Sequence, residues 1–177
     1  MKKNNKFISF FYDFASIIVT GMIVIAVVFT FFFRTAGVNG RSMVPTLHHQ
    51  DMLLLSSHYS NPKQGDIVII TQPNAFNEPI VKRIIAVGGQ TIDIDFLSGT
   101  VFVDGKALQE NYINELTRDR EDFKGPVTVP EGFVFVMGDN RNNSTDSRSN
   151  LVGMIDVRYI YGKVQGRILP TGSWKVY

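Results

Sequence analysis

The sequence predicts a mainly β chain, in which one antiparallel β domain follows a single N-terminal transmembrane helix. Two observations support this prediction. First, 20 consecutive residues near the N-terminus carry no charge, and at about 1.5 Å per residue a helix of that length spans a hydrocarbon core of about 30 Å. Second, beyond about residue 35 the short apolar runs alternate with a period of two and are separated by Gly, Pro and Asn. That pattern is typical of antiparallel β domains, including barrel-like ones.

The uncharged stretch runs from Phe14 to Phe33, and we interpret it as an anchor that is not cleaved. A cleavable signal peptide would have an apolar region of about 7–15 residues followed by an A-x-A-like site. Here the region is longer, and R-T-A-G-V follows it. Lys2, Lys3 and Lys6 precede the stretch and only Arg34 follows it closely, so the positive-inside rule places the N-terminus in the cytoplasm. We therefore expect a cytoplasmic segment at 1–13, a transmembrane helix at 14–33 and an extracytoplasmic β domain at 35–177.

Several segments of this domain have the composition of strands. Residues 91–96 (T-I-D-I-D-F) alternate strictly and are followed by L-S-G-T and 101–103, which predicts a hairpin. A Pro-Glu-Gly turn likewise separates two apolar runs at 127–129 and 133–137. Other expected strands are 68–71, a strand that begins at 106, 159–164 and 166–169. The polar stretch 111–124 is expected to be a surface excursion.

Composition excludes several classes of protein. The chain has 18 basic and 16 acidic residues and 44% hydrophobic residues, whereas disordered chains combine low hydrophobicity with high net charge. Nucleic-acid-binding proteins usually carry a basic face or stripe. The net charge here is only +2, so we expect no nucleic-acid partner. The chain has no cysteine, which excludes disulfides and a thiolate nucleophile. The three histidines lack metal-ligand spacing and V-G-G-Q at 87–90 is too short for a P-loop, so no metal or cofactor is expected.

The first stretch that does not resemble an ordinary strand or turn is G-R-S-M-V-P-T-L at 40–47. Ser42 lies between Gly40 and Pro45, and the proline stiffens the chain. The α/β-hydrolase motif G-x-S-x-G is not matched, because Val44 occupies the place of the second glycine. A simple linker turn is the alternative interpretation.

The second stretch is I-V-K-R-I-I-A-V-G-G at 80–89, in which Lys82 and Arg83 interrupt an apolar run. Neighbouring residues of a strand point to opposite faces, so one of the two points to the face that buries Ile80 and Ile84. A lysine on the apolar face loses hydration, and its pKa falls toward a value useful for a base. An edge-strand lysine with a solvated tip is the alternative.

The third stretch is M-G-D-N-R-N-N-S-T-D-S-R at 137–148. Asn, Asp and Ser at this density form side-chain-to-backbone hydrogen bonds that fix an irregular loop. Asp139, Arg141, Asp146 and Arg148 can cross-brace it, whereas a flexible surface loop is the alternative. The three stretches together provide a serine, a lysine in apolar surroundings and a rigid loop. Serine needs a base to become a nucleophile. Without a credible His–Asp pair, lysine is the remaining candidate, and Ser–Lys pairs are an accepted variant.

In these motifs the chain resembles the type I signal peptidases, in particular the short, single-anchor members of Gram-positive bacteria. S-M-V-P-T at 42–46 resembles the family's nucleophile box, K-R-I-I-A-V-G-G at 82–89 its lysine box, and G-D-N-R-N-N-S-T-D-S-R at 138–148 its most characteristic run. The order and spacing of the three boxes also agree. The fold that this resemblance implies is the antiparallel β signal-peptidase fold, which LexA-like self-cleaving repressors share. Ala86, Gly88 and Gln90 depart from the usual lysine box, at its distal end.

The resemblance also implies roles for individual residues. Ser42 would be the nucleophile and Lys82 the general base, and Ser144 would help to orient the lysine amine. Asp146 and Arg148 would be structural supports, with Asp146 facing Arg83. The expected oxyanion and substrate groove contains Gly40, Met43, Ile80 and Val81. Because relatives place a serine where this chain has Gly40, we expect Gly40 to adopt a backbone conformation open to other residues. A positive φ, which is closed to other residues, is the alternative.

The expected function is that of a membrane-anchored serine endopeptidase that removes signal peptides from exported preproteins. Its partners would be preproteins with small residues one and three positions before the cut, membrane lipid and a nearby secretion translocon. Two alternatives are kept. A self-cleaving LexA-like protease would be soluble, against which the anchor argues, and an inert membrane-tethered binding module would not need both Ser42 and Lys82.

Overall fold

A computed structural model describes residues 3–73 and 75–170, with side chains from residue 8 onward. The chain divides into two compact units, residues 1–34 and 35–177. The first unit is the helix α1 (Lys3–Phe32). Its segment Ile8–Phe32 is long and apolar enough to cross a membrane, and none of its most apolar window is buried by protein. The helix begins at Lys3 rather than at the expected Phe14, and its apolar segment already starts at Ile8, because Asp13 is one charge within an otherwise apolar stretch.

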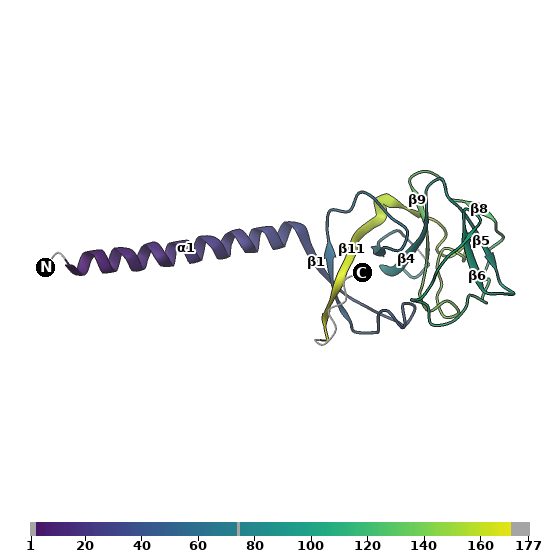
Figure 1. Ribbon diagram of the computed structural model, residues 1–177, viewed down its shortest axis with the longest axis horizontal. Coiled ribbons are helices and arrows are strands. Elements are labelled where there is room, and N and C mark those ends of the chain that lie inside the picture. The colour runs from purple at the N-terminus through teal and green to yellow at the C-terminus, as the bar shows by residue number, and fades with distance from the viewer. Residues whose placement is uncertain (1–2, 74, 171–177) are drawn as a thin grey trace. The chain divides into compact units, whose positions relative to one another are not determined.

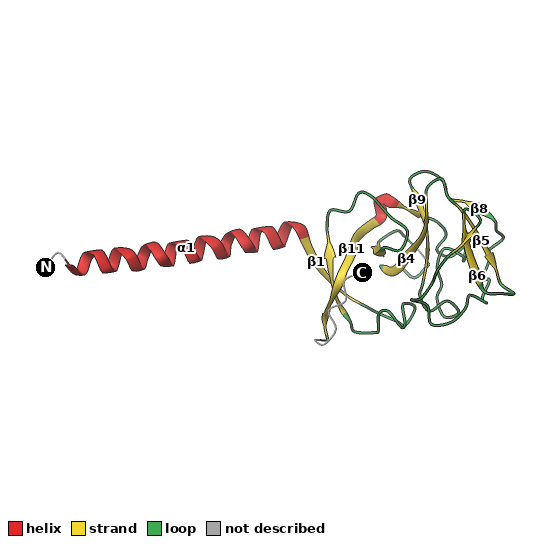
Figure 2. Ribbon diagram, in the orientation of Figure 1, coloured by secondary structure: helices red, strands yellow, loops and turns green. Residues whose placement is uncertain are grey.

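The second unit is built from short strands, and among its described residues helical backbone is confined to one turn (Figure 2). The strands are β1 (Phe33–Gly37, which starts at the boundary), β2 (Met52–Ser56), β3 (Ile67–Ile70), β4 (Ile80–Val87), β5 (Thr91–Asp95), β6 (Thr100–Val103), β7 (Lys106–Ala107), β8 (Val127–Thr128), β9 (Phe133–Met137), β10 (Ile155–Asp156) and β11 (Ile160–Leu169), with the 3₁₀ turn η1 (Val157–Tyr159) before β11.

The strands form two sheets. One has seven strands in the order β1-β2-β11-β3-β4-β9-β10, and the other has four in the order β7-β6-β5-β8. Strands β5, β6 and β8 lie at one end of this unit and β11 at the other (Figure 1). The described strand registers are all antiparallel, which confirms the predicted mainly antiparallel β class.

The hairpin predicted from the alternation at 91–96 is confirmed as β5 and β6, because Ile92 pairs with Val103 and Ile94 with Val101. The predicted turn at Pro-Glu-Gly, between 127–129 and 133–137, has another role. It does not join two paired strands, because β8 pairs with β5 in the small sheet whereas β9 pairs with β4 in the large one. The strands expected at 159–164 and 166–169 are one strand, β11, with an irregularity between Val164 and Gly166.

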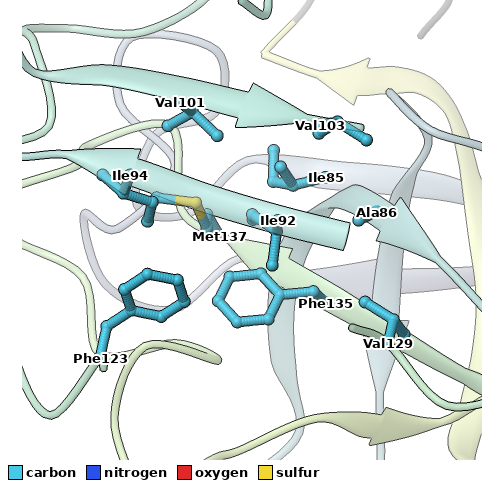
Figure 3. Close-up of a cluster of buried hydrophobic side chains, with 10 residues drawn as sticks. All are labelled: Ile85, Ala86, Ile92, Ile94, Val101, Val103, Phe123, Val129, Phe135 and Met137. Carbon is cyan, nitrogen blue, oxygen red and sulfur yellow. The ribbon is translucent and has the colours of Figure 1, made fainter. Parts of the chain in front are cut away.

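A hydrophobic core fills the space between the small sheet and strands β4 and β9 (Figure 3). Burial of each large apolar side chain contributes about 1.5–3 kcal/mol. The segment 111–124, expected to be a surface excursion, takes part in this core. Phe123 packs edge-on against Phe135 with ring centroids 5.8 Å apart, and Thr117 is fully buried. The segment is polar in composition, but Thr117 and Phe123 are buried, whereas Leu116 is exposed.

Candidate active site

Ser42 lies on a loop whose base is closed by backbone hydrogen bonds. The N–H of Val38 donates to the carbonyl of Asp51 (2.8 Å), and the N–H of Gln50 donates back to the carbonyl of Val38 (2.9 Å). Immediately after the serine, Met43 is only 1% exposed and packs in a core cluster together with the fully buried Leu47. The apolar anchors therefore fix the backbone on which Ser42 sits.

Lys82 lies on β4, between β3 and β9. Its Nζ donates to Ser42 Oγ at 2.8 Å, and the residue is 4% exposed. Burial lowers the pKa of Lys82 to about 8, while the carboxylate of Asp146 acts in the opposite direction. A solvated lysine is neutral about once in a few thousand molecules at pH 7, whereas a pKa near 8 gives roughly one in ten. The strand thus presents a lysine that can be deprotonated, within reach of a hydroxyl.

The loop 138–148 packs directly on the nucleophile segment. The N–H of Asn140 donates to the carbonyl of Ser42 (2.9 Å), and its Nδ2 donates to the carbonyl of Arg41 (3.1 Å). A Cβ at Gly138 would lie 2.4 Å from the Ser42 carbonyl oxygen and 2.2 Å from Ser144 Oγ. Only glycine fits there, so the loop and the nucleophile segment approach more closely than side chains at position 138 would allow.

Asp146 organises the interior of this loop and is fully buried. Its Oδ2 accepts hydrogen bonds from the N–H of Gly138 and from Ser144 Oγ, both at 2.9 Å. Its Oδ1 accepts from Arg148 Nε at 2.9 Å. Arg148 Nη2 also donates to the carbonyl of Arg141 at 2.6 Å. Ser144, expected to orient the lysine amine, lines a cavity together with Lys82, and its hydroxyl donates to Asp146.

The expected ion pair between Arg83 and Asp146 is wrong. Arg83 pairs with Asp139, with Nε–Oδ1 and Nη2–Oδ2 distances of 2.8 and 2.6 Å. The strand register explains this choice. Arg83 lies opposite Met137 in the β4–β9 pair, and Asp139 follows two residues later. Asp146, in turn, is paired with an arginine only two residues away.

The Arg83–Asp139 pair also connects the lysine strand to the nucleophile loop. Thr46 Oγ1 donates to Asp139 Oδ2 at 2.5 Å, and the guanidinium of Arg83 lies 3.9 Å from the ring centroid of Tyr112. Of the four loop residues expected to cross-brace, only Asp146 and Arg148 pair with each other, since Arg141 pairs with Glu110. The loop is therefore braced both by its own Asp146 and Arg148 and by other parts of the chain.

Two cavities adjoin the Ser42–Lys82 pair, with volumes of about 300 and 260 Å³. Both cavities are lined by the same four residues, Ser42, Lys82, Ile80 and Phe76. The first is also lined by Val81 and the second by Gly40, as expected of a groove, whereas Met43 lines neither. Sequence reasoning missed Phe76, whose one signal is a lone aromatic residue in the polar loop before β4.

Gly40 has a backbone conformation that other residues rarely adopt. Its φ is +96°, and a Cβ there would meet nothing within 4 Å. The expectation of an unstrained position is therefore wrong, because the constraint is the backbone angle and not space. The N–H of Gly40 donates to Nδ1 of the exposed His49 at 3.4 Å. Within the described part of the chain, no group of three or more His, Asp or Glu side chains is arranged to hold a metal ion.

The chain is similar in sequence to several known proteins. A signal peptidase I from Bacillus licheniformis is 36% identical over 180 aligned positions, covering 96% of this chain and 94% of that protein. A probable signal peptidase I-1 from Synechocystis is 38% identical, covering 75% and 69%. The signal peptidase I P of Bacillus subtilis subsp. natto is 35% identical, covering 85% and 84%.

A crystal structure of a signal peptidase I from Enterococcus faecalis is 29% identical, covers 60% of this chain and 98% of that chain, and has a TM-score of 0.49. The family model described as signal peptidase, peptidase S26, matches residues 11–169, which is most of the sequence. With that match and relatives above 30% identity over most of both chains, this chain belongs to the peptidase S26 family of signal peptidases.

Proposed function

We propose that this chain is a membrane-anchored serine endopeptidase that cleaves signal peptides from exported preproteins, with Ser42 as the nucleophile and Lys82 as the general base. The observation that carries the proposal is the 2.8 Å distance between Lys82 Nζ and Ser42 Oγ, together with the burial of the lysine. Family membership supplies the reaction class, and the pair supplies chemistry that performs it.

The reaction proceeds in two steps. Neutral Lys82 accepts the hydroxyl proton as Ser42 Oγ attacks the scissile carbonyl carbon. The resulting ammonium returns this proton to the leaving amine, the peptide C–N bond breaks, and an acyl-enzyme ester remains. In the second step Lys82 takes a proton from water, whose oxygen attacks the ester. Ser42 then leaves with that proton, and the carboxylic acid product is released.

The supporting residues hold the base and the nucleophile in place. Asp146 fixes Ser144 beside the lysine and is itself held by Arg148. Arg83 anchors the lysine strand to the loop through Asp139. In this proposal they contribute orientation and a dry environment, and they do not take part in the bond changes.

The oxyanion that forms during attack needs donors aimed at it. We infer that the backbone N–H of Ser42 provides one of them. Gly40 has no side chain to donate, so a second donor must come from another backbone N–H or from water. Loss of one such donor typically lowers the rate by about 10²–10³-fold, which makes a second donor a requirement of the mechanism.

The substrate and the location follow from the groove and the anchor. Gly40, Ile80 and Val81 line small cavities, so we expect small side chains one and three positions before the cut. The lysines before the uncharged stretch 14–33 argue for a cytoplasmic N-terminus and an extracytoplasmic peptidase domain. There, near the translocon, the domain would meet signal peptides that are still embedded in lipid.

The test is cleavage of a preprotein by the detergent-solubilised full chain, with sequencing of the new N-terminus. Wild type should cut once, after a small residue, whereas Ser42→Ala, Lys82→Ala and Lys82→Arg should not cut. Arginine fails as a base because guanidinium stays protonated near neutral pH. Substantial activity in any of the three variants would refute the Ser–Lys assignment. Lys106→Ala, an exposed lysine on β7, is the control and should cut like wild type.

A further inference from the structure

Tyr112 lies in the irregular segment between β7 and β8, against the supports of the Ser42–Lys82 pair. Its ring covers the guanidinium of Arg83, which follows Lys82 on β4, with 3.9 Å between Cζ and the ring centroid. Its carbonyl accepts a hydrogen bond from Thr46 Oγ1 at 3.4 Å, and Thr46 lies on the loop that carries Ser42. One residue thus contacts both the strand of the base and the loop of the nucleophile.

The ring covers the one part of the Arg83 guanidinium that hydrogen bonds do not use. Nε and Nη2 donate to Asp139 at 2.8 and 2.6 Å, and Nη1 donates to the carbonyl of Gly65 at 2.8 Å. These donors all point outward in the plane of the guanidinium. A planar cation whose edges are bound is still open to water at its faces, and the ring of Tyr112 excludes water from one face.

The covered ion pair connects the two halves of the reacting pair. Asp139 accepts hydrogen bonds both from Arg83, next to the base, and from Thr46, on the nucleophile loop. The side chain of Arg83 is 9% exposed and that of Asp139 is 0% exposed. Charges interact more strongly, and are screened less by salt, where water is excluded than where they are hydrated. The connection therefore stays stiff only while water is kept from the ion pair.

The segment of Tyr112 is itself fixed to the loop 138–148 on both sides of the ring. The Tyr112 hydroxyl donates to Glu110 Oε1 at 3.3 Å, and Glu110 pairs with the buried Arg141 of the loop at 2.5 Å. Two residues after the tyrosine, the N–H of Asn114 donates to the carbonyl of Asp139 at 3.2 Å. These bonds hold the ring in place independently of its contact with the guanidinium.

We propose that Tyr112 is a positioning residue of the peptidase reaction. Its ring shields the Arg83–Asp139 pair from water, and the shielded pair keeps the general base within hydrogen-bond reach of the nucleophile. The proposal rests on the signal peptidase function above, and it gives a role to the segment 111–124. The ring and not the hydroxyl carries this role, because the hydroxyl binds Glu110 and only the ring covers the cation.

Two variants separate the ring from the hydroxyl. Tyr112→Phe keeps a ring over Arg83, so its kcat should stay close to that of wild type. Tyr112→Ala opens the face of the guanidinium, and kcat should fall by about 10–100-fold, since a misplacement of about 1 Å costs about 100-fold. KM should change little, because Tyr112 itself lines neither of the two cavities at the reacting pair.

The salt dependence of kcat distinguishes shielding from a general weakening of the fold. Salt screens hydrated charges, with a Debye length of about 8 Å at 0.15 M and about 3 Å at 1 M. The kcat of wild type and Tyr112→Phe should not respond to salt in this range, because water is kept from the ion pair. In Tyr112→Ala the pair is hydrated, so kcat should fall further as salt is added.

The matched control is Phe96→Ala, because this ring also covers an arginine. The guanidinium of Arg120 lies 5.0 Å from the ring centroid of Phe96. The ring packs at 6.1 Å against Phe123 of the core between the two sheets. Its loss should therefore lower the melting temperature without changing kcat or the salt dependence of kcat.

The experiment measures kcat and KM of the detergent-solubilised full chain on one signal-peptide substrate, at low and high salt. The enzymes are wild type, Tyr112→Phe, Tyr112→Ala and Phe96→Ala, each assayed below its melting temperature. The expected result is a low, salt-sensitive kcat in Tyr112→Ala alone. A wild-type kcat in Tyr112→Ala, an equal loss in Tyr112→Phe, or the same salt dependence in all four enzymes would overturn the proposal.

A second substitution covers the case in which Tyr112→Ala does not fold. Tyr112→Leu fills more of the space, but it covers less of the planar face and lacks the attraction of a ring for the cation. It should show the same changes in kcat and in salt dependence, and a wild-type kcat in this variant would likewise overturn the proposal. If wild type cleaves no preprotein and no peptide, the proposed function itself fails, which is a different outcome.

Discussion

Replacement of Lys82 by methionine should abolish cleavage and stabilise the fold at the same time. Burial lowers the pKa of Lys82 from 10.5 to about 8, so the folded state disfavours the charged lysine. One pKa unit corresponds to about 1.4 kcal/mol, and the shift therefore corresponds to a cost of about 3 kcal/mol when lysine is charged in both states. Methionine has a similar length and no charge, and it removes this cost.

The sign and the pH range follow from linkage. Below about pH 8 the lysine is protonated in the folded and in the unfolded state, and the full cost is present. Between pH 8 and 10.5 the unfolded state binds the extra proton, so wild-type stability rises with pH relative to the variant. The advantage of Lys82→Met should thus be largest near pH 6.5 and should disappear above about pH 10.5.

The assay is thermal unfolding of both proteins across this range, with Lys106→Met as the matched control. About 3 kcal/mol corresponds to roughly 6–12 °C for a domain of this size, and the control at an exposed lysine should show no comparable shift. In parallel, wild-type kcat/KM should rise about tenfold per pH unit up to pH 8 and level off above it. A Lys82→Met variant that is less stable at pH 6.5, or an activity flat down to pH 5, would refute the reasoning.

Three further predictions test the support of the site and the topology. Gly40→Ala and Gly40→Ser should lower kcat/KM equally, by about tenfold, because a φ of +96° costs either residue about 1–2 kcal/mol; an active serine variant beside an impaired alanine variant would contradict this. Asp146→Ala should lower both activity and the melting temperature, because it leaves the buried Arg148 uncompensated at about 3–5 kcal/mol; equal stability in denaturant titrations would argue against it. External protease added to wall-less cells should digest residues beyond about 35, and protection of that region would invert the proposed orientation.

Local patterns in the sequence were sufficient for much of the fold. The hairpin of β5 and β6 could be predicted because alternation over 91–96 requires one buried face, and Ile92 and Ile94 supply it. The strand β2 was missed because M-L-L-L-S shows no alternation in composition. Only burial reveals its two faces, with Leu53 and Leu55 inside.

The candidate site, like the fold, could be predicted from the sequence only in part. The presence of a serine, an apolar-flanked lysine and a rigid loop could be recognised from residue types and spacing. The conformation of Gly40 could not, because glycine is compatible with both signs of φ. The contribution of Phe76 could not be predicted either, since a loop residue reaches a site through tertiary structure and not through any local pattern.

The choice of ion-pair partners shows why such details lie beyond local reasoning. The loop offers two aspartates to Arg83, and both are buried, so charge and burial do not distinguish them. The decisive fact is that β4 and β9 pair with Arg83 opposite Met137, although about 50 residues separate them in sequence. A period of two then brings Asp139 to the face of Arg83, and Asp146 is left for Arg148, which is close enough in sequence to fold back on it. The strand register therefore assigns the two carboxylates to two tasks: one fixes the lysine strand to the nucleophile loop, and the other fixes the loop that carries Ser144.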